Sequence, residues 1–593
     1  MTELLVLHLT GIHFPSLPLS LGSLINLRTL SFDCCHLEDV ARVGDLATLE
    51  ILSFRNSHIE QLPEQIGNLT RLKLLDLSNC SKLKVIKPEV ISRLSRLNEL
   101  YMGNSFTRKV EGQSNAIVVE LKQLSSLTIL DMHIPDAQLL LEDLISVDLE
   151  RYRIFIGDVW NWSGKYECSR TLKLKLDNSI YLGYGIKKLL KTTEDLYLDN
   201  LNGIQNIVQE LDNGEGFPRL KHLHVQNDPK ILCIANSEGR VIFPLLQSLF
   251  LCNLILLEKV CGSQVQLTED NQSFTNFRII NIGQCHRLKH LFPSFMAEKL
   301  LQLEELEVTD CKILRMIVGE ETDNHDHENG SMRVVNFNHL HSLALRRLPQ
   351  LTSSGFYLET PTTGGSEEIT AEDDPQNLLA FFNKKVVYIS VDVHGHTYFS
   401  LLLNDQKSIS SSCLDVQVVF PGLKKLEMVS INIERIWPNQ FPATSYSSQQ
   451  LTELTVDKCG CLKFLFSSSM VNSLKQLQRL EISQCASMQG IIDTGLGREE
   501  NLIEMVFPKL VYLSLSHLPQ LSRFGIGNLV ELPSLRQLSI NFCPELKRFI
   551  CAHAVEMSSG GNYHGDTQAL FDEKVDSCSC CFYITCRDVW YTG

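Results

Sequence analysis

The stretch that decides the fold runs over residues 46–106 and reads LATLEILSFRNSHIEQLPEQIGNLTRLKLLDLSNCSKLKVIKPEVISRLSRLNELYMGNSF. The pattern Leu-x-x-Leu-x-Leu starts in it at Leu49, Leu72 and Leu97, in steps of 23 and 25 residues. A period of this length is typical of leucine-rich repeats, in which each unit supplies one short strand and a return segment. One repeat cannot bury its own leucines, but stacked repeats form a continuous apolar column. The sequence therefore predicts a solenoid.

The predicted fold is an α/β leucine-rich-repeat solenoid, a curved horseshoe with parallel β-strands on its concave face. Short helices, 3₁₀ turns and loops are expected on the convex face. In the regular part of the chain, strands are expected near 4–9, 27–32, 49–54, 72–77, 97–102 and 127–132. The intervening segments LPEQIGNL (62–69) and IKPEVISRL (86–94) are predicted to form short helical or 3₁₀ turns that begin at proline.

Repeat style divides the chain into six segments. They are regular repeats at 1–132, irregular repeats at 133–216, second-style repeats with acidic loops at 217–386, a non-repeat insertion at 387–418, repeats that duplicate part of 217–386 at 419–556, and a non-repeat tail at 557–593. The second style opens with Phe-Pro-x-Leu, as in FPRLKHLHV (217–225), and the duplication relates 285–311 to 459–485. The insertion and residues 576–593 lack leucine spacing; we interpret them as translated non-coding sequence that packs loosely.

Charge and hydropathy indicate which classes of function are disfavoured. A formal net charge of −15 argues against nucleic acid as the main partner, because such surfaces need clustered Lys and Arg. No apolar run approaches the roughly 20 residues that span a bilayer. The N-terminus lacks the features of a secretion signal, so a cytoplasmic location is expected. The sequence also starts inside a repeat, which predicts that it is a fragment of a longer protein.

Seven cysteines recur three residues after the last apolar strand position. They are Cys35, Cys80, Cys285, Cys311, Cys459, Cys485 and Cys543. This place in the repeat takes a small buried group, and a regular stack of thiols there fits a reducing compartment. The motifs HDHE (325–328) and HGH (394–396) and the cysteines at 578–586 are weighed as metal ligands and interpreted as non-binding. No catalytic, cofactor or metal site, and no enzyme activity, is predicted.

The surface expected to carry function follows from strand geometry. If the leucines point inward, the residues between them point outward along the concave face. The candidate protein-binding residues are Arg55, Asp76, Glu99, Tyr101, Tyr197, His222, His224, Phe250, Glu305, Glu307, Lys425, Glu427, Arg479, Glu481 and Tyr512. The aromatic members are the favoured anchors, because rigid aromatic side chains dominate interface hot spots. The glutamates give the distal face an acidic bias that suits a basic partner, with Lys425 and Arg479 as exceptions.

Two segments closely resemble the repeats of plant coiled-coil, nucleotide-binding, leucine-rich-repeat disease resistance proteins. They are SHIEQLPEQIGNLTRLKLLDLSNCSKLKVIKPEVISRLSRLNELYMGNSF (57–106) and INIERIWPNQFPA (431–443). The resemblance implies an intracellular sensor of pathogen effectors or modified host proteins. Its protein partners would be an effector, a guarded host protein, or the nucleotide-binding domain of a receptor. The phosphate-binding motif of that family, G-x-x-x-x-G-K-[ST], is missing, so we expect the sensor part without its nucleotide switch. The alternative is a free-standing adaptor, such as a substrate-recognition subunit of a ubiquitin ligase.

Overall fold

The computed structural model describes most of the repeat cores. The described residues are 3–105, 117, 119–134, 149–157, 168–175, 184–201, 204–211, 216–235, 242–261, 274–319, 333–351, 355–357, 416–419, 422–431, 450–467, 474–493, 505–522, 524, 530–546 and 582–585. The chain forms two compact units. Unit 1 comprises Met1–Leu254 and Thr268–Ser273, and unit 2 comprises Ile255–Leu267 and Phe274–Gly593.

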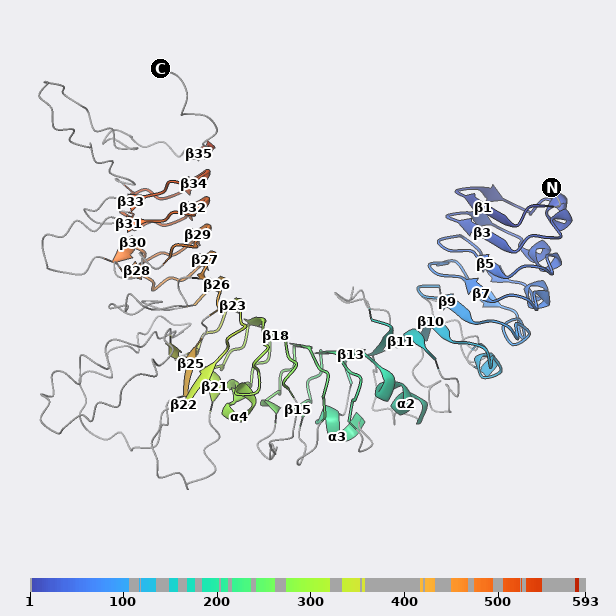
Figure 1. The fold of residues 1–593 in the computed structure, drawn as a ribbon, viewed down its shortest axis with the longest axis horizontal. Helices are drawn as coiled ribbons and strands as arrows, with labels where there is room; N and C mark the ends of the chain where they lie inside the picture. Colours follow the sequence, from blue (N-terminus) through green and yellow to red (C-terminus); the bar gives the residue numbers. More distant parts are fainter. Residues whose placement is uncertain are drawn as a thin grey trace, which may run out of the picture. The chain divides into compact units, whose positions relative to one another are not determined.

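Unit 1 contains a parallel sheet to which each repeat contributes one strand (Figure 1). In order, its strands are β1 (Val6–Thr10), β3 (Thr29–Asp33), β5 (Ile51–Ser53), β7 (Leu74–Asp76), β9 (Glu99–Met102), β10 (Ile129–Ile134), β11 (Arg151–Ile156), β12 (Arg170–Lys175), β13 (Asp195–Asp199), β14 (His222–Gln226) and β16 (Ser248–Cys252). Each pairs with the next in parallel. The predicted solenoid of parallel strands is confirmed.

The strands of unit 1 begin about two residues later than the sequence pattern predicts. Leu49 and Leu72 lie in turns, because their amides donate to the carbonyls of Leu46 (3.0 Å) and Leu69 (2.9 Å). Ladder pairing starts only at Ile51 in β5 and at the equivalent residue of β7. The first leucine of each repeat is therefore a core residue of the turn that enters the strand.

The leucines of the pattern fill the interior as predicted. Leu52, Leu75 and Leu100 are each 0% exposed, and the turn leucines that precede them are equally buried. Burial of one such side chain contributes about 1.5–3 kcal/mol. Because every repeat adds the same positions, the core extends by stacking.

The return segments of unit 1 are 3₁₀ helices or turns. Those at η1 (Leu19–Ser23), η2 (Ala41–Asp45) and η3 (Glu64–Asn68) are 3₁₀ helices, and Pro63 precedes η3 as expected for 62–69. In the predicted segment 86–94, Ile86 ends a short strand and residues 87–94 form turns and no helix, contrary to the prediction. There the buried carboxylate of Glu120 accepts the amides of Glu89 (2.8 Å) and Ile91 (2.9 Å). The next repeat thus satisfies amides that a helix would leave open at its start.

Shorter elements complete unit 1. They are α2 (Tyr184–Thr192), α3 (Ile207–Leu211), β2 (His13–Phe14), β4 (His36–Leu37), β6 (Gln61–Leu62), β8 (Val85–Ile86) and β15 (Cys233–Ala235). Strand β2 pairs with β4, and β6 with β8, in parallel. The hydroxyl of Tyr152, an inward residue of β11, donates to the carbonyl of Leu189 at 3.0 Å. Helix α2 therefore covers the inner side of the sheet, opposite the face on which Arg151 and Arg153 lie.

Unit 2 repeats the same plan. Its main sheet runs through β18 (Ile279–Gly283), β20 (Glu305–Thr309), β23 (Ser342–Arg346), β26 (Lys425–Val429), β27 (Glu453–Asp457), β29 (Arg479–Ser483), β32 (Tyr512–Ser516) and β34 (Gln537–Asn541), all parallel. Its shorter elements are β17 (Lys259–Cys261), β19 (His290–Pro293), α4 (Ser294–Ala297), β21 (Met316–Gly319), β22 (Arg333–Asn336), β24 (Gly355–Tyr357), β25 (Val416–Val419), β28 (Phe464–Ser467), β30 (Gly490–Asp493), β31 (Met505–Val506) and β33 (Val530–Glu531). The duplicated blocks 285–311 and 459–485 each contain one short strand and one main strand, in the same order.

Two pieces of the predicted non-repeat segments pair with the repeats. Strand β35 (Phe582–Thr585) lies in the tail and pairs antiparallel with β34. The end of the insertion belongs to β25, which pairs in parallel with β22 and β24. The rest of both segments lies outside the described residues, so their interpretation as loosely packed translated non-coding sequence remains a prediction.

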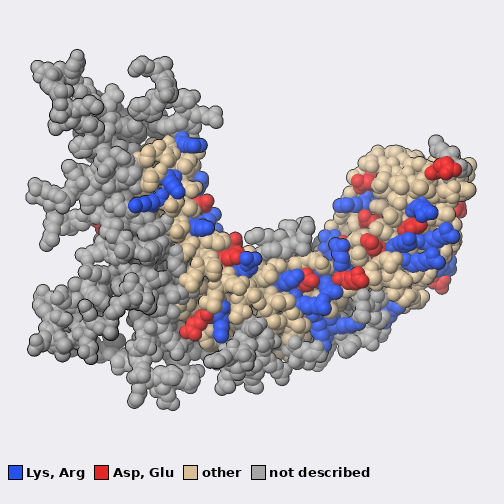
Figure 2. Space-filling model, in the orientation of Figure 1, with Lys and Arg blue, Asp and Glu red and all other residues tan. Residues whose placement is uncertain are grey.

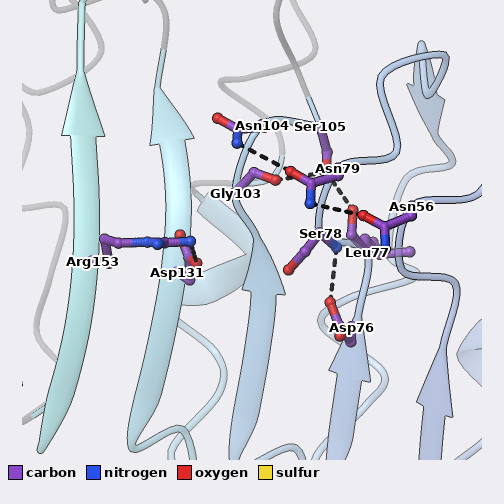
Figure 3. A network of polar contacts seen from close by, with 10 residues as sticks. All are labelled: Asn56, Asp76, Leu77, Ser78, Asn79, Gly103, Asn104, Ser105, Asp131 and Arg153. Atoms are coloured by element: carbon purple, nitrogen blue, oxygen red, sulfur yellow. Dashed lines mark hydrogen bonds and ion pairs between the residues drawn. The ribbon is translucent and has the colours of Figure 1, made fainter. Parts of the chain in front are cut away.

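The recurring cysteines occupy the interior. Six of the seven are buried, Cys543 is half-buried, and all are free thiols. The Cys80 thiol donates to the carbonyl of Phe54 in the preceding repeat at 3.0 Å, and burial raises its pKa to about 12. Ser57 and Ser105 take the same position in neighbouring repeats. Ser57 donates to the carbonyl of Phe32, and Ser105 donates to that of Leu77 (Figure 3). A small hydrogen-bonding group is therefore what this position requires.

A left-handed residue follows each main strand whose following residues are described. In unit 1 it is usually asparagine, with φ of 58° at Asn56 and 60° at Asn79 and Asn104. Asparagine tolerates this conformation better than other residues with a Cβ. The Asn79 amide donates to the Asn56 side chain at 2.9 Å, and that of Asn104 donates to Asn79 at 3.1 Å (Figure 3). These contacts form an asparagine ladder that joins consecutive repeats.

Replacing Asn79 should separate the two contributions to this ladder. Asn79→Ala is expected to lower the free energy of unfolding by about 1–3 kcal/mol, because it loses the side-chain bonds and strains a left-handed residue. Asn79→Gly loses only the bonds and should cost about half as much. Urea denaturation followed by circular dichroism measures both. Equal losses in the two variants would contradict a contribution from the backbone conformation.

Candidate protein-binding surface

The side chains between the inward leucines form rows across the sheet of unit 1, because neighbouring strands pair in register. One row, which we call the apolar row, comprises Val6, Thr29, Ile51, Leu74, Glu99, Ile129 and Arg151. A second, the ring row, comprises Phe155, Lys173, Tyr197, His224 and Phe250. These rows make up the outward face that the sequence predicted to bind other proteins.

The predicted residues of the first repeats lie on this face as expected. Arg55 is exposed, while Asp76, Glu99 and Tyr101 are half-buried. The Tyr101 hydroxyl donates to Glu99 at 2.7 Å. Burial, together with this hydrogen bond and the adjacent negative charge, raises the pKa of Tyr101 to about 12. Tyr101 is therefore a neutral, fixed aromatic group and fits the role of an anchor.

Strands β13 and β14 differ from the prediction. Tyr197, His222 and His224 were expected at the surface as binding residues, but they are buried, with Tyr197 only 1% exposed. Strands in a sheet lie about 4.8 Å apart, so planar side chains in register stack face to face. The Tyr197 and His224 rings stack with centroids 3.9 Å apart, and His224 stacks on Phe250 at 4.5 Å. Of the predicted anchors in this row, Phe250 alone is half-exposed.

Charge is buried inside the ring row. The Lys173 ammonium lies between the rings of Phe155 (4.6 Å) and Tyr197 (4.5 Å). Burial lowers its pKa to about 8, although Asp195 opposes the shift. His224 Nε2 lies 3.1 Å from the carboxylate of Asp195. Burial lowers the pKa of His224 more than this contact raises it. The buried members of the ring row are therefore part of the sheet's framework, whereas Phe155 and Phe250 keep part of their rings exposed.

Acidification should destabilise this part of unit 1. Burial lowers the pKa of His222 to about 4 from the ordinary 6.5. Between these values the unfolded histidine takes up a proton that the folded one does not, so the free energy of unfolding is expected to fall as pH drops from 6.5 to 4. His222→Asn should flatten this dependence in urea denaturation series. His8→Asn, at an exposed position of β1, is the control, and an unchanged slope in the His222 variant would contradict the assignment.

Sequence reasoning missed the charged residues of β10 to β12. Arg153 forms an ion pair with the buried Asp131 of the neighbouring strand (Figure 3). Burial raises the pKa of Asp131, although Arg153 opposes the shift. Arg151 lies beside them on the same face and is exposed. The period-two alternation of β10 and β11 indicates that these charged residues point outward. The irregular repeat spacing between the two strands concealed which residues pair across them.

In unit 2, arginine neutralises part of the predicted acidic face. Arg346, which was not among the predicted residues, contacts Glu307 and binds Glu427 through two hydrogen bonds of 2.8 and 2.7 Å. The Arg346 hydrogen bonds and charge lower the pKa of Glu427. Glu305, Glu307 and Glu427 are all half-buried on the outward face. Glu307 and Glu427 thus have a cation within the chain, which weakens the expectation of a basic partner.

The predicted residues of β26, β29 and β32 contact charged or aromatic neighbours on the same face. Lys425 lies 3.6 Å from Glu453, and Arg479 lies 3.0 Å from Glu481. The Arg479 guanidinium also covers the Tyr512 ring, with its Cζ 3.8 Å from the centroid. Tyr512 therefore presents only part of its ring on the outward face. Arg479, Glu481 and Tyr512 therefore contact one another on this face, which leaves less of each side chain for a partner.

The described residues contain no candidate metal site. Among the described residues, no group of three His, Cys, Asp or Glu side chains is placed to hold a metal ion. The motifs at 325–328 and 394–396 and the cysteines at 578–586 lie outside the described residues. Within the described part of the chain, no helix is long and apolar enough to cross a membrane.

Comparison with known families decides the affiliation. The model of the family described as "Plant disease resistance protein RPS2-like, leucine-rich repeats" matches residues 185–312, 258–353 and 422–557, together just over half of the chain. The chain belongs to this family. A second model, described as "Leucine-rich repeat region", matches residues 3–151. The predicted resemblance to plant disease resistance proteins is therefore confirmed.

The chain also matches individual proteins. The chain is 28% identical over 369 residues to Disease resistance protein At4g27190 of Arabidopsis thaliana, an alignment covering 59% of this chain and 36% of the relative. The chain thus spans about a third of that protein's length. An internalin of Listeria monocytogenes matches at 15% identity, with 59% of this chain and 83% of that chain covered and a TM-score of 0.34. The plant peptide hormone receptor RGFR1 in complex with RGF2 matches at 15% identity, with 93% and 79% covered and a TM-score of 0.32.

Proposed function

We propose that this chain is the protein-recognition module of an intracellular plant immune receptor, which senses pathogen effectors or modified host proteins. The observation that carries the proposal is the family match over more than half of a solenoid whose outward side chains are held in register. A sheet face of this kind offers a large, rigid surface to a protein, and rigid surfaces lose little entropy on binding. The proposed compartment is the cytoplasm, in which free buried thiols stay reduced.

Proximity labelling in leaf cells tests the function. The chain is fused to a biotin ligase and expressed in healthy and infected tissue, and labelled proteins are compared. We expect labelled partners that depend on infection and that disappear when Arg55 and Arg151 are both changed to Glu. Reversing the charge of Lys187 and Lys188 on α2 is the matched control. Labelling that is identical in both tissues, or in all variants, would contradict a sensor role for the outward face.

A further inference from the structure

We propose that the outward face of unit 1 from β5 to β11 binds an amphipathic helix of a partner protein, which carries apolar side chains along its length and a carboxylate at one end. The proposal rests on the proposed function and specifies the chemistry of the partner. It differs from the expectation drawn from sequence, which placed the charged recognition on the distal repeats and predicted a basic partner.

The apolar row supplies the hydrophobic part of this surface. Ile51 is 37% exposed, and Leu74 and Ile129 are half-buried on the same outward face. Ile51 and Leu74 are direct register partners, and Ile129 lies two strands further along the row. Single exposed apolar residues are common, so the observation used here is the register alignment of these three on one face, with Glu99 between Leu74 and Ile129. Tyr101, one strand before Ile129, adds a fixed aromatic edge.

Two arginine residues lie at the β11 end of the apolar row. Arg151 is the register partner of Ile129, and Arg153 lies two residues further on. Arg153 forms an ion pair with Asp131, but among the described residues no carboxylate lies within ion-pair distance of Arg151. Glu99, the acid within the row, already accepts the Tyr101 hydroxyl. Figure 2 shows Lys and Arg around β11 and α2 with Asp and Glu among them, and the lysines of α2 belong to the opposite side of the sheet from Arg151. A partner carboxylate is the complementary group at this end.

The spacing favours a helix over an extended strand. The five strands from β5 to β11 are about 4.8 Å apart, so the row is about 19 Å long. A helix rises about 5.4 Å per turn, which nearly matches one strand spacing, and covers this length in about 13 residues. An extended peptide presents side chains on one face only every 6.7 Å or so, which matches neither one strand spacing nor two. Apolar residues at helical positions i, i+3 and i+10 would meet Ile51, Leu74 and Ile129, and an acid at i+14, which lies on the same face of the helix, would meet Arg151.

Selection from a library tests this directly. A phage library of 18-residue helical peptides is selected for binding to the full chain. The enriched peptides are labelled, and their affinities are measured by fluorescence anisotropy. We expect winners with three or four apolar residues at helical spacing and a terminal Asp or Glu. Arg151→Glu should weaken their binding at least tenfold, while Lys187→Glu, the same charge change on α2, should leave it within twofold. A winner with its acid changed to Lys should regain binding to the Arg151 variant.

The contrary outcomes are equally defined. Enrichment of no helical sequence, or winners that bind the Arg151→Glu and Lys187→Glu variants alike, would overturn the proposal. Arg151 is exposed, so a matching circular dichroism spectrum and urea midpoint verify that its variant folds. The peptide result also stands apart from the leaf labelling. Acid-dependent peptide binding without infection-dependent labelling would remove the proposed immune function and leave the helix site in place.

Discussion

Leu75→Ala is expected to lower the free energy of unfolding by about 2–5 kcal/mol, the largest stability effect we predict. Leu75 is fully buried in β7, and its removal leaves a cavity between two stacked repeats. Urea denaturation followed by circular dichroism measures the loss. The adjacent residue Leu74 points outward in the same strand, so Leu74→Ala is a control that changes the same atoms and should cost less than about 1 kcal/mol.

Similar losses in the two leucine variants would contradict the alternation of inward and outward residues. That alternation is what makes one side of each strand core and the other side surface. Because stacked repeats support one another, the loss at Leu75 should also loosen the neighbouring strands β5 and β9. Hydrogen exchange of their amides should speed up in Leu75→Ala and not in Leu74→Ala.

Arg346→Ala is expected to lower the free energy of unfolding by about 1–3 kcal/mol. The change leaves the half-buried carboxylates of Glu307 and Glu427 on one face without their shared cation. Solvent reaches all three side chains and screens the pair, which keeps the effect below that of a fully buried ion pair. The neighbouring Arg347 pairs with Asp310 at a more exposed edge, so Arg347→Ala is the control and should cost under about 1 kcal/mol.

The same contact predicts a pH dependence. Arg346 lowers the pKa of Glu427 below its ordinary 4.5. A carboxyl with a lowered folded pKa stabilises the protein above its unfolded value and loses that contribution as pH falls through the folded value. The difference between the wild type and Arg346→Ala should therefore be constant near neutrality and shrink below about pH 4.5. A difference that stays constant down to pH 3 would show that the pair contributes nothing through charge.

The sequence pattern predicted the interior better than the surface. Leu52, Leu75 and Leu100 were placed correctly because core burial depends on spacing within one repeat. The strand starts were set two residues early, since the first leucine of the pattern is buried equally well in a turn. Nothing in the spacing distinguishes a buried turn residue from a buried strand residue.

The outward face depends on neighbours that are distant in sequence. Tyr197 is covered by Lys173 and His224, which are 24 and 27 residues away, so its own repeat gives no sign of burial. Arg346 likewise meets Glu427 across an interval of 81 residues. Such contacts become predictable only when the register of every repeat is known. The irregular spacing of 133–216 and the long segment before 419 prevented that.

Photocrosslinking tests the central claim most directly: that proteins bind the outward side chains of the strands. A photoreactive phenylalanine analogue replaces Ile51 in β5 or Leu19 in η1, and each chain is irradiated in infected leaf cells. Leu19 is 77% exposed and Ile51 only 37%, so exposure alone would favour position 19. We predict a crosslinked partner from position 51 and none from position 19. Crosslinks from position 19 with none from position 51 would contradict the account.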